Sequence, residues 1–524
     1  MTGTLRLLRF MLRRERFMLP WWLLGATLLV LTQSGQSQNL YGTPEKLHQL
    51  RETIGANTAV IAMSGPTRLL DSIGGEIVFE MFAFVAIVVA LMNMFLIGRH
   101  TRADEESGRA ELIRSARVGR FAPLAAALTL AGLADATAGV LVFAVAAGTG
   151  LPIGGSVLLG AAVAGVGLTF AALTAVAAQV FENTRAAYGL VGLLIGAAFV
   201  LRAAGDVGDG SLSWASPIGW GQRTFPYAGD RWWPLLLPFG ASVLLGAVAV
   251  GLLGRRDLGA GLIRPRPGRA TAARSLRTTY ALAWRLQRGA LIGWAAGLAL
   301  LGVGYGSIGD SIEQYVRDNP QIAGFLPGGA ADVVNAYLAL TIGLSALLVA
   351  AYGVTSALRV RAEETSGRAE PVLATAAGRP AWLAGHLSVA LAGSALVLVS
   401  YGLGEGVAYG LTVGDAGQVP RLAGAALAYL PAVWLIIAGT VLVIGWLPRA
   451  TAPLAWIAVA YCAVVTLFAD SFDLPGWVRR ASPFAHTPRV PAVDLTVTPL
   501  LVLVLLTALL MVAGGAGLRR RDIG

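Results

Sequence analysis

The feature that most constrains the fold is a series of apolar runs, each about 20 residues long, which is the length a helix needs to cross a bilayer. One of them, IVFEMFAFVAIVVALMNMFLIG (Ile77 to Gly98), is apolar on all sides rather than along one stripe. Only 13% of the residues are charged, whereas soluble domains carry about 25%. The sequence therefore predicts an all-α polytopic membrane protein.

Twelve transmembrane helices are predicted, six in each half of the chain. In the first half, residues 1–263, they lie at roughly 19–33, 77–98, 122–148, 156–181, 187–203 and 233–254. In the second half, residues 264–524, they lie at roughly 289–306, 335–358, 381–411, 423–447, 453–469 and 498–518. The basic, apolar N-terminus is interpreted as an uncleaved first helix, because no small-residue cleavage pattern follows it.

Positive charge is distributed unevenly about these spans. Of the 40 Lys and Arg residues, 29 fall on the side of the two termini, and Lys46 is the one lysine. By the positive-inside rule both termini are cytoplasmic. We therefore expect a multi-pass protein of the bacterial cytoplasmic (inner) membrane. The net charge of +11 reflects this topology, and no nucleic-acid partner is expected.

Two peptides on the predicted cytoplasmic side nearly repeat each other. RADEESGRAELIRSARVGR (Arg102–Arg120) and RAEETSGRAEPVLATAAGR (Arg361–Arg379) each join the second and third helix of a half. LGRRDLG and LRRRDIG close the two halves, and an amphipathic basic segment opens each. We expect those opening segments to lie on the cytoplasmic leaflet. The common order predicts two parallel six-helix repeats related by a pseudo-two-fold axis along the membrane normal.

The repeated peptide has two interpretations. Its acids and arginines could cap a short helix and pair with one another in a solvated loop. Alternatively, each copy docks into a partner that is itself two-fold, which would give the duplication a physical reason.

The loop pattern E-E-x-x-G-R-x-E resembles that of ABC-2 type permeases of ATP-binding-cassette exporters. The fused twelve-span form is similar to actinobacterial exporters of polyketide antibiotics and tetronasin-type ionophores. In that family the loop is a coupling helix seated in a cleft of the ATPase subunit. The resemblance assigns this role to Asp104, Glu105, Glu106, Gly108, Arg109 and Glu111, and to Glu363, Glu364, Gly367, Arg368 and Glu370. The second copy departs at Thr365 and Pro371, so the two contacts could be unequal.

The chain itself is not expected to be an enzyme. A P-loop needs G-x-x-x-x-G-K-[ST], and the lone lysine lies in YGTPEKLHQL. The resemblance thus implies that ATP and Mg are bound by a separate ATPase, most simply a homodimer with two chains per permease chain. The other expected partners are membrane lipid and an amphipathic small-molecule substrate. The sequence does not choose among drugs, polyketides and lipid or cell-wall precursors.

Three carboxylates are predicted within or near the spans: Asp135 near the middle of the third, Glu80 near the outer end of the second, and Glu405 near the outer end of the ninth. A carboxylate in a membrane is costly and is a candidate functional residue. Binding of a cationic substrate group or gating is one interpretation, and hydrogen bonding between helices is the other. No metal site is expected, because Cys462 is the one cysteine and the four histidines are scattered.

Two other protein classes fit the sequence less well. A proton-coupled major facilitator exporter also has six plus six spans, but its loop reads like G-x-x-x-D-R-x-G-R-R, which GRHTRADEESGRAE does not match. A membrane-embedded transferase would need a metal-binding or carboxylate-rich outer loop, for which GDSIEQYVRDNP is a weak candidate.

Overall fold

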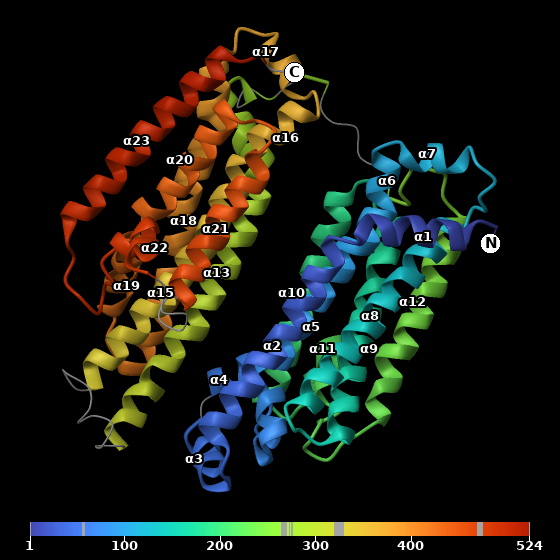
Figure 1. Cartoon of the computed structure of the whole chain (residues 1–524), viewed down its shortest axis with the longest axis vertical. Coiled ribbons are helices and arrows are strands. Elements are labelled where there is room, and N and C mark those ends of the chain that lie inside the picture. Colours follow the sequence, from blue (N-terminus) through green and yellow to red (C-terminus); the bar gives the residue numbers. More distant parts are fainter. Residues whose placement is uncertain are drawn as a thin grey trace. The chain divides into compact units, whose positions relative to one another are not determined.

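The computed structural model describes residues 2–54, 58–263, 270–271, 273, 276–318, 330–468 and 475–522. Every regular element in these ranges is a helix. The chain divides into two compact units, Met1–Pro267 and Gly268–Gly524 (Figure 1). The division falls in the predicted linker, most of which lies outside the described residues. That the units are copies of one transmembrane repeat stays a prediction.

Unit 1 contains the helices of the first predicted half. Its long helices are α2 (Met18–Tyr41), α5 (Ile73–His100), α8 (Ala122–Gly148), α9 (Ile153–Val180), α10 (Thr184–Val207) and α12 (Leu236–Gly254). The shorter ones are α1 (Thr4–Glu15), α3 (Pro44–Ile54), α4 (Thr58–Met63), η1 (Thr67–Asp71), α6 (Arg102–Glu106), α7 (Arg109–Arg114), η2 (Leu212–Ala215), α11 (Pro217–Gln222) and η3 (Trp233–Leu235).

Unit 2 also consists of long helices joined by shorter ones. Its long helices are α13 (Thr279–Asp318), α15 (Ala330–Ala357), α18 (Arg379–Val413), α19 (Gln418–Leu427) with α20 (Leu430–Trp446), α21 (Thr451–Phe468) and α23 (Val497–Arg520). The shorter ones are α16 (Arg359–Thr365), α17 (Ala369–Leu373), α22 (Gly476–Ala481) and η5 (Pro483–His486).

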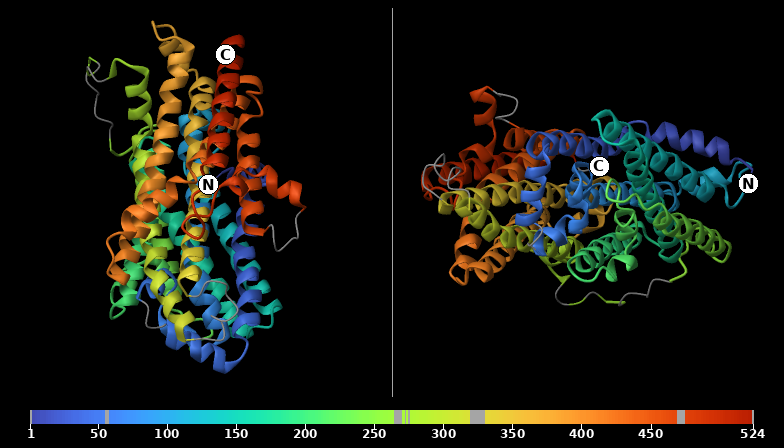
Figure 2. Two further views of the ribbon diagram at one scale, coloured as in Figure 1. Left: turned by 90° about the vertical axis from the view of Figure 1, so that its left-hand side faces the viewer. Right: turned by 90° about the horizontal axis from the view of Figure 1, so that it is seen from below.

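A helix occupies each of the twelve predicted ranges. In the described part of the chain, 10 helices are long and apolar enough to cross a membrane, and the bent pair of α1 and α2 would make 11. The remaining prediction corresponds to α21, a shorter apolar helix. Figure 2 shows the long helices of each unit running alongside one another. The chain is therefore an all-α polytopic membrane protein, as predicted.

The amphipathic segments that open the two halves differ in structure. In unit 1, α1 is a separate helix that bends by 67° from α2. Pro20 lies in the first turn of α2 and cannot donate to the carbonyl four residues back, so the chain breaks there. The segment that opens unit 2 has no such proline, and α13 continues through it without a break. A separate opening helix thus exists in unit 1, whereas in unit 2 the opening segment is part of the long helix α13. That these segments lie on the cytoplasmic leaflet stays a prediction.

In unit 1, the segment between α2 and α5 contains α3, α4 and η1. In unit 2 the corresponding region begins with the end of α13, and residues 319–329 lie outside the described part.

Glycines bring α13 and α18 of unit 2 into backbone contact. A Cβ atom added at Gly302 would lie 2.3 Å from the carbonyl oxygen of Tyr401, and one at Gly404 would lie 2.2 Å from that of Ala299. Small residues that let helices approach this closely are typical of membrane helix interfaces.

We therefore expect Gly302→Ala to lower the stability of unit 2 by about 1–3 kcal/mol, the usual cost of overpacking against backbone that cannot move aside. Gly297, on the same helix, has open space around it, so Gly297→Ala is the matched control and should be neutral or slightly stabilising. The measurement is thermal unfolding of the purified chain in detergent. Equal melting temperatures for the two variants would contradict this packing.

Candidate functional site

The repeated peptides each form two short helices joined at a glycine. In unit 1, α6 and α7 meet at Gly108, whose φ is 73°, and in unit 2, α16 and α17 meet at Gly367, whose φ is 70°. Glycine adopts these left-handed angles without strain, which explains why both copies carry it. We call residues 101–115 loop 1 and residues 359–374 loop 2.

A buried ion pair joins loop 1 to the end of α12. The guanidinium of Arg256, in the LGRRDLG motif, donates to the two carboxylate oxygens of Glu105 at 2.6 and 2.8 Å. Arg102, on α6 itself, is a second partner of Glu105. Arg256 also donates to Gln179 of α9 at 2.8 Å, so three elements meet at this guanidinium. We call Arg102, Glu105 and Arg256 clamp 1.

The same arrangement occurs in unit 2. Arg521, in the LRRRDIG motif at the end of α23, donates to both oxygens of Glu364, one of them at 2.8 Å. Arg361, the counterpart of Arg102, pairs with Glu364 at 2.8 Å. We call Arg361, Glu364 and Arg521 clamp 2. The two sequence motifs that recur in the halves are therefore the two sides of one structural contact, formed once in each unit.

A second contact holds the last helix of each unit by its carboxyl end. Arg120 donates to the carbonyl oxygens of Leu253 and Arg256 at 3.0 and 2.9 Å, and Arg379 donates to that of Arg521 at 2.8 Å. The last carbonyls of a helix have no partner within the helix, and a cation there is favourable. Both ends of each repeated peptide are thus attached to the same helix end.

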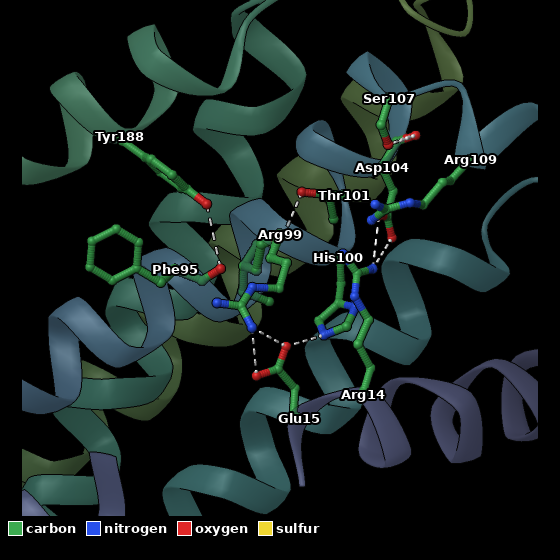
Figure 3. A network of polar contacts seen from close by, with 11 residues as sticks. Arg14, Glu15, Phe95, Arg99, His100, Thr101, Asp104, Ser107, Arg109 and Tyr188 are labelled. Atoms are coloured by element: carbon green, nitrogen blue, oxygen red, sulfur yellow. Dashed lines mark hydrogen bonds and ion pairs between the residues drawn. The ribbon is translucent and has the colours of Figure 1, made fainter. Parts of the chain in front are cut away.

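Loop 1 is also attached to α1. Arg14 donates to both oxygens of Asp104 at 2.8 and 2.9 Å, and Arg109 lies 3.4 Å from the same carboxylate (Figure 3). Glu15 of α1 contacts Arg99 and His100 at the end of α5, at 3.0 and 2.9 Å. These ion pairs fix α1 against α5 and α6.

The electrostatics of Glu15 favour these contacts. Burial works to raise the pKa of its carboxyl, but the hydrogen bond with His100 and the charge of Arg99 outweigh burial and hold that pKa below its ordinary value. In unit 2 the counterpart of Asp104 is Glu363, and its partners Arg359 and Arg368 come from loop 2 itself. Loop 2 therefore lacks a contact like that of Asp104 with Arg14 among the described residues.

The predicted coupling residues fall into two groups. Those that point into the unit and are paired there are Asp104, Glu105, Glu363 and Glu364. Those exposed at the surface of the loops are Glu106, Arg109, Glu111, Arg368 and Glu370. Leu112, not among the predicted residues, is 74% exposed on α7. The prediction that the acids of the first group touch a partner stays untested, but their structural partners are within the chain.

Glu106 has an additional contact, since its carboxylate accepts a hydrogen bond from the backbone N–H of Thr184, the first residue of α10. Sequence reasoning missed Arg256 and Arg521 altogether. Their motifs were recognised as repeats, but nothing in the sequence alone connected them with the loops.

The predicted intramembrane acids Asp135 and Glu405 lie inside their own units. Asn93 of α5 donates to Asp135 of α8 at 2.7 Å, and Thr341 of α15 donates to Glu405 of α18 at 2.6 Å. Both carboxyl groups are completely buried. Hydrogen bonds between helices, the second interpretation considered above, describe both contacts.

Glu80 lies on α5 and is half-buried. One turn earlier, Glu76 is completely buried, and it was missed because the predicted span began one residue after it. Among the described residues no group of three or more His, Cys, Asp or Glu side chains could hold a metal ion.

A helical chain of this length, with paired loops attached to the last helix of each unit, belongs to the class of polytopic membrane proteins. Residues 276–519 match the family described as "Multidrug efflux system permease Rv1217c, C-terminal domain". Over its whole length, and 95% of the relative's, the chain is 41% identical to the multidrug efflux system permease protein Rv1217c of Mycobacterium tuberculosis. The chain belongs to this family of multidrug efflux system permeases.

Proposed function

We propose that the chain is the transmembrane permease subunit of an ATP-binding-cassette exporter that moves amphipathic compounds, antibiotic, polyketide or other drug-like molecules, out of the cell. The family relationship supports export of drugs by a permease. The observation that supports coupling to an external motor is the double clamp: the same buried pair ties an exposed loop to the last helix in each unit. A solvated connector would not need this attachment twice.

In this proposal each loop docks on one subunit of an ATPase dimer, which binds ATP and Mg. The exposed side chains of α7 and α17 form the docking face. When ATP closes the dimer, loops 1 and 2 move with it, and clamps 1 and 2 transmit that movement to α12 and α23. Bidentate arginine–carboxylate pairs suit this role, since they fix both distance and orientation. The substrate gains outward access as the units change conformation.

The energy source separates this proposal from the major facilitator alternative, which the family relationship does not favour. In inside-out vesicles containing the chain and its ATPase, we expect drug uptake when ATP is supplied and a proton ionophore is present. Uptake that needs a proton gradient and ignores ATP would instead support the alternative. A P-loop variant of the ATPase that cannot hydrolyse ATP provides the control.

The proposed orientation, with both termini and both loops cytoplasmic, rests on the 29 of 40 basic residues on that side. Ser107 and Ser366 are exposed in loops 1 and 2, and Lys46 is exposed on α3, which follows the end of α2 away from α1. With the buried Cys462 replaced, we expect Lys46→Cys to react with an impermeant thiol reagent in intact cells and Ser107→Cys and Ser366→Cys to react only after lysis. The reverse pattern would overturn the orientation.

A further inference from the structure

α1 carries more positive charge than its protein contacts use. Arg6, Arg9 and Arg13 are exposed and have no acidic partner among the described residues, whereas Arg14 alone points inward to Asp104. Large exposed apolar side chains alternate with these arginines along the sequence. On α1 they are Leu5 at 72%, Phe10 at 52% and Leu12 at 39% exposure, and Phe17, at 68%, follows α1.

This alternation is what a helix in the headgroup region of a bilayer needs. α1 is bent by 67° from α2. With α2 crossing the bilayer, as predicted, α1 runs closer to the membrane plane than α2 does. Apolar side chains can then enter the acyl chains while the arginine stems extend to the phosphates. Because these three exposed guanidinium groups have no acidic partner in the described part of the chain, they are available to anionic headgroups, which carry the complementary charge.

α1 is also mechanically connected to loop 1. Its Arg14 holds Asp104 of α6, and its Glu15 holds Arg99 and His100 at the end of α5 (Figure 3). Its buried face, with Leu7 and Met11, packs against unit 1. A headgroup that fixes α1 will therefore also restrain loop 1. Among the described residues, the counterpart of Asp104 in loop 2, Glu363, is held instead by arginines of its own loop.

We infer that α1 is a binding surface for anionic phospholipid headgroups, and that their binding orders loop 1 but not loop 2. This goes beyond the proposed export function, since it makes the two loops respond unequally to the lipid composition of the membrane. It does not depend on an ATPase, because both the binding and its consequence are properties of this chain.

The test uses the full chain in nanodiscs of phosphatidylcholine, with or without phosphatidylglycerol. Hydrogen exchange is followed in α1, loop 1 and loop 2. We expect phosphatidylglycerol to slow exchange in α1 and loop 1, to leave loop 2 unchanged, and to lose this effect at about 1 M salt, where charges are screened within about 3 Å. Compared with a helix that lacks them, the three arginines of α1 should strengthen headgroup binding on the order of 100-fold.

Two variants and one control make the test specific. Arg6→Gln with Arg9→Gln and Arg13→Gln should abolish the protection of both α1 and loop 1. Arg14→Gln should keep the protection of α1 but lose that of loop 1. The control, Arg277→Gln with Arg285→Gln and Arg288→Gln on unit 2, should behave as wild type. Unchanged protection in the triple α1 variant, or equal protection of both loops in the wild type, would overturn the inference. If the wild-type chain shows this lipid response but does not export drugs with its ATPase, that result would count against the proposed function and not against this inference.

Discussion

Replacing Arg256 with alanine is expected to abolish drug export while the chain still inserts in the membrane. The substitution leaves the Glu105 carboxylate in a largely buried position with Arg102 as its remaining clamp partner. Removing one member of a buried ion pair costs about 3–5 kcal/mol, and here a value near 3 is expected because Arg102 compensates in part. Loop 1 would then no longer move together with α12.

The chain supplies a matched control for each unit. Arg255 and Arg520 are the exposed neighbours of Arg256 and Arg521 in the same motifs. Arg255→Ala and Arg520→Ala should export normally, whereas Arg521→Ala should fail like Arg256→Ala. The measurement is drug efflux in cells, normalised to the amount of chain in the membrane.

A double-mutant cycle separates a specific pair from a general loss of charge. Glu105→Gln and Arg256→Gln should each lower the melting temperature, and the double variant should lose less than the sum, with a coupling of about 0.5–3 kcal/mol. Simple additivity would mean that the contact contributes nothing as a pair.

Charge placed on the exposed face of α7 should prevent assembly with the ATPase. Leu112 is 74% exposed and lies beside the exposed Glu111, so neither side chain holds the unit together. Glu111→Arg with Leu112→Arg puts two cations where the proposed partner meets an acid and an apolar group. Mismatched charge in such an interface costs several kcal/mol, which weakens assembly on the order of 100-fold or more.

The readout is recovery of the ATPase with affinity-tagged chain. Trp477→Arg is the control, because Trp477 is similarly exposed at 75% but lies on α22, between α21 and α23 at their opposite end from loop 2. Full recovery of the ATPase with the α7 variant would show that this face is a solvated surface.

A comparison with the α7 variant also tests the role of the buried acids Glu105 and Glu364. The resemblance assigned Glu105 and Glu364 to the contact with the ATPase, where reversing their charge would repel the partner directly. In the structure these carboxylates bind arginines of their own unit, so Glu105→Arg and Glu364→Arg should act by breaking clamps 1 and 2. Both should therefore lower the stability of the isolated chain, whereas the α7 variant should not.

The spans could be predicted because a bilayer restricts the structures that an apolar segment can adopt. With no water to satisfy backbone groups, apolar stretches of this length become helices, and every predicted range contains one. A short helix in each loop was also among the interpretations of the repeated peptide, whereas the glycine turns at Gly108 and Gly367 were not predicted.

The clamps could not be predicted, because they join residues far apart in the chain. Glu105 and Arg256 are separated by 151 residues, and Glu364 and Arg521 by 157. Whether two helix ends meet depends on the packing of the spans between them, which hydropathy does not specify. The repeats LGRRDLG and LRRRDIG were a signal, but only the structure connects them with the acids of loops 1 and 2.

α1 is a separate helix whereas α13 is continuous, and this difference has a local cause that the composition of the two segments does not indicate. Both segments are basic and amphipathic, yet only the first is followed by a proline, Pro20, that interrupts the helix.

The central claim is that one chain carries two docking loops for a separate ATPase dimer. The most direct measurement purifies the tagged chain from its host in mild detergent and determines the mass and ATPase activity of the intact assembly. We predict one chain with two copies of an ATPase, hydrolysis of ATP by the assembly, and none by the chain stripped of its partner. A chain that purifies alone, exports its drug in vesicles without ATP, or hydrolyses ATP by itself would contradict the account.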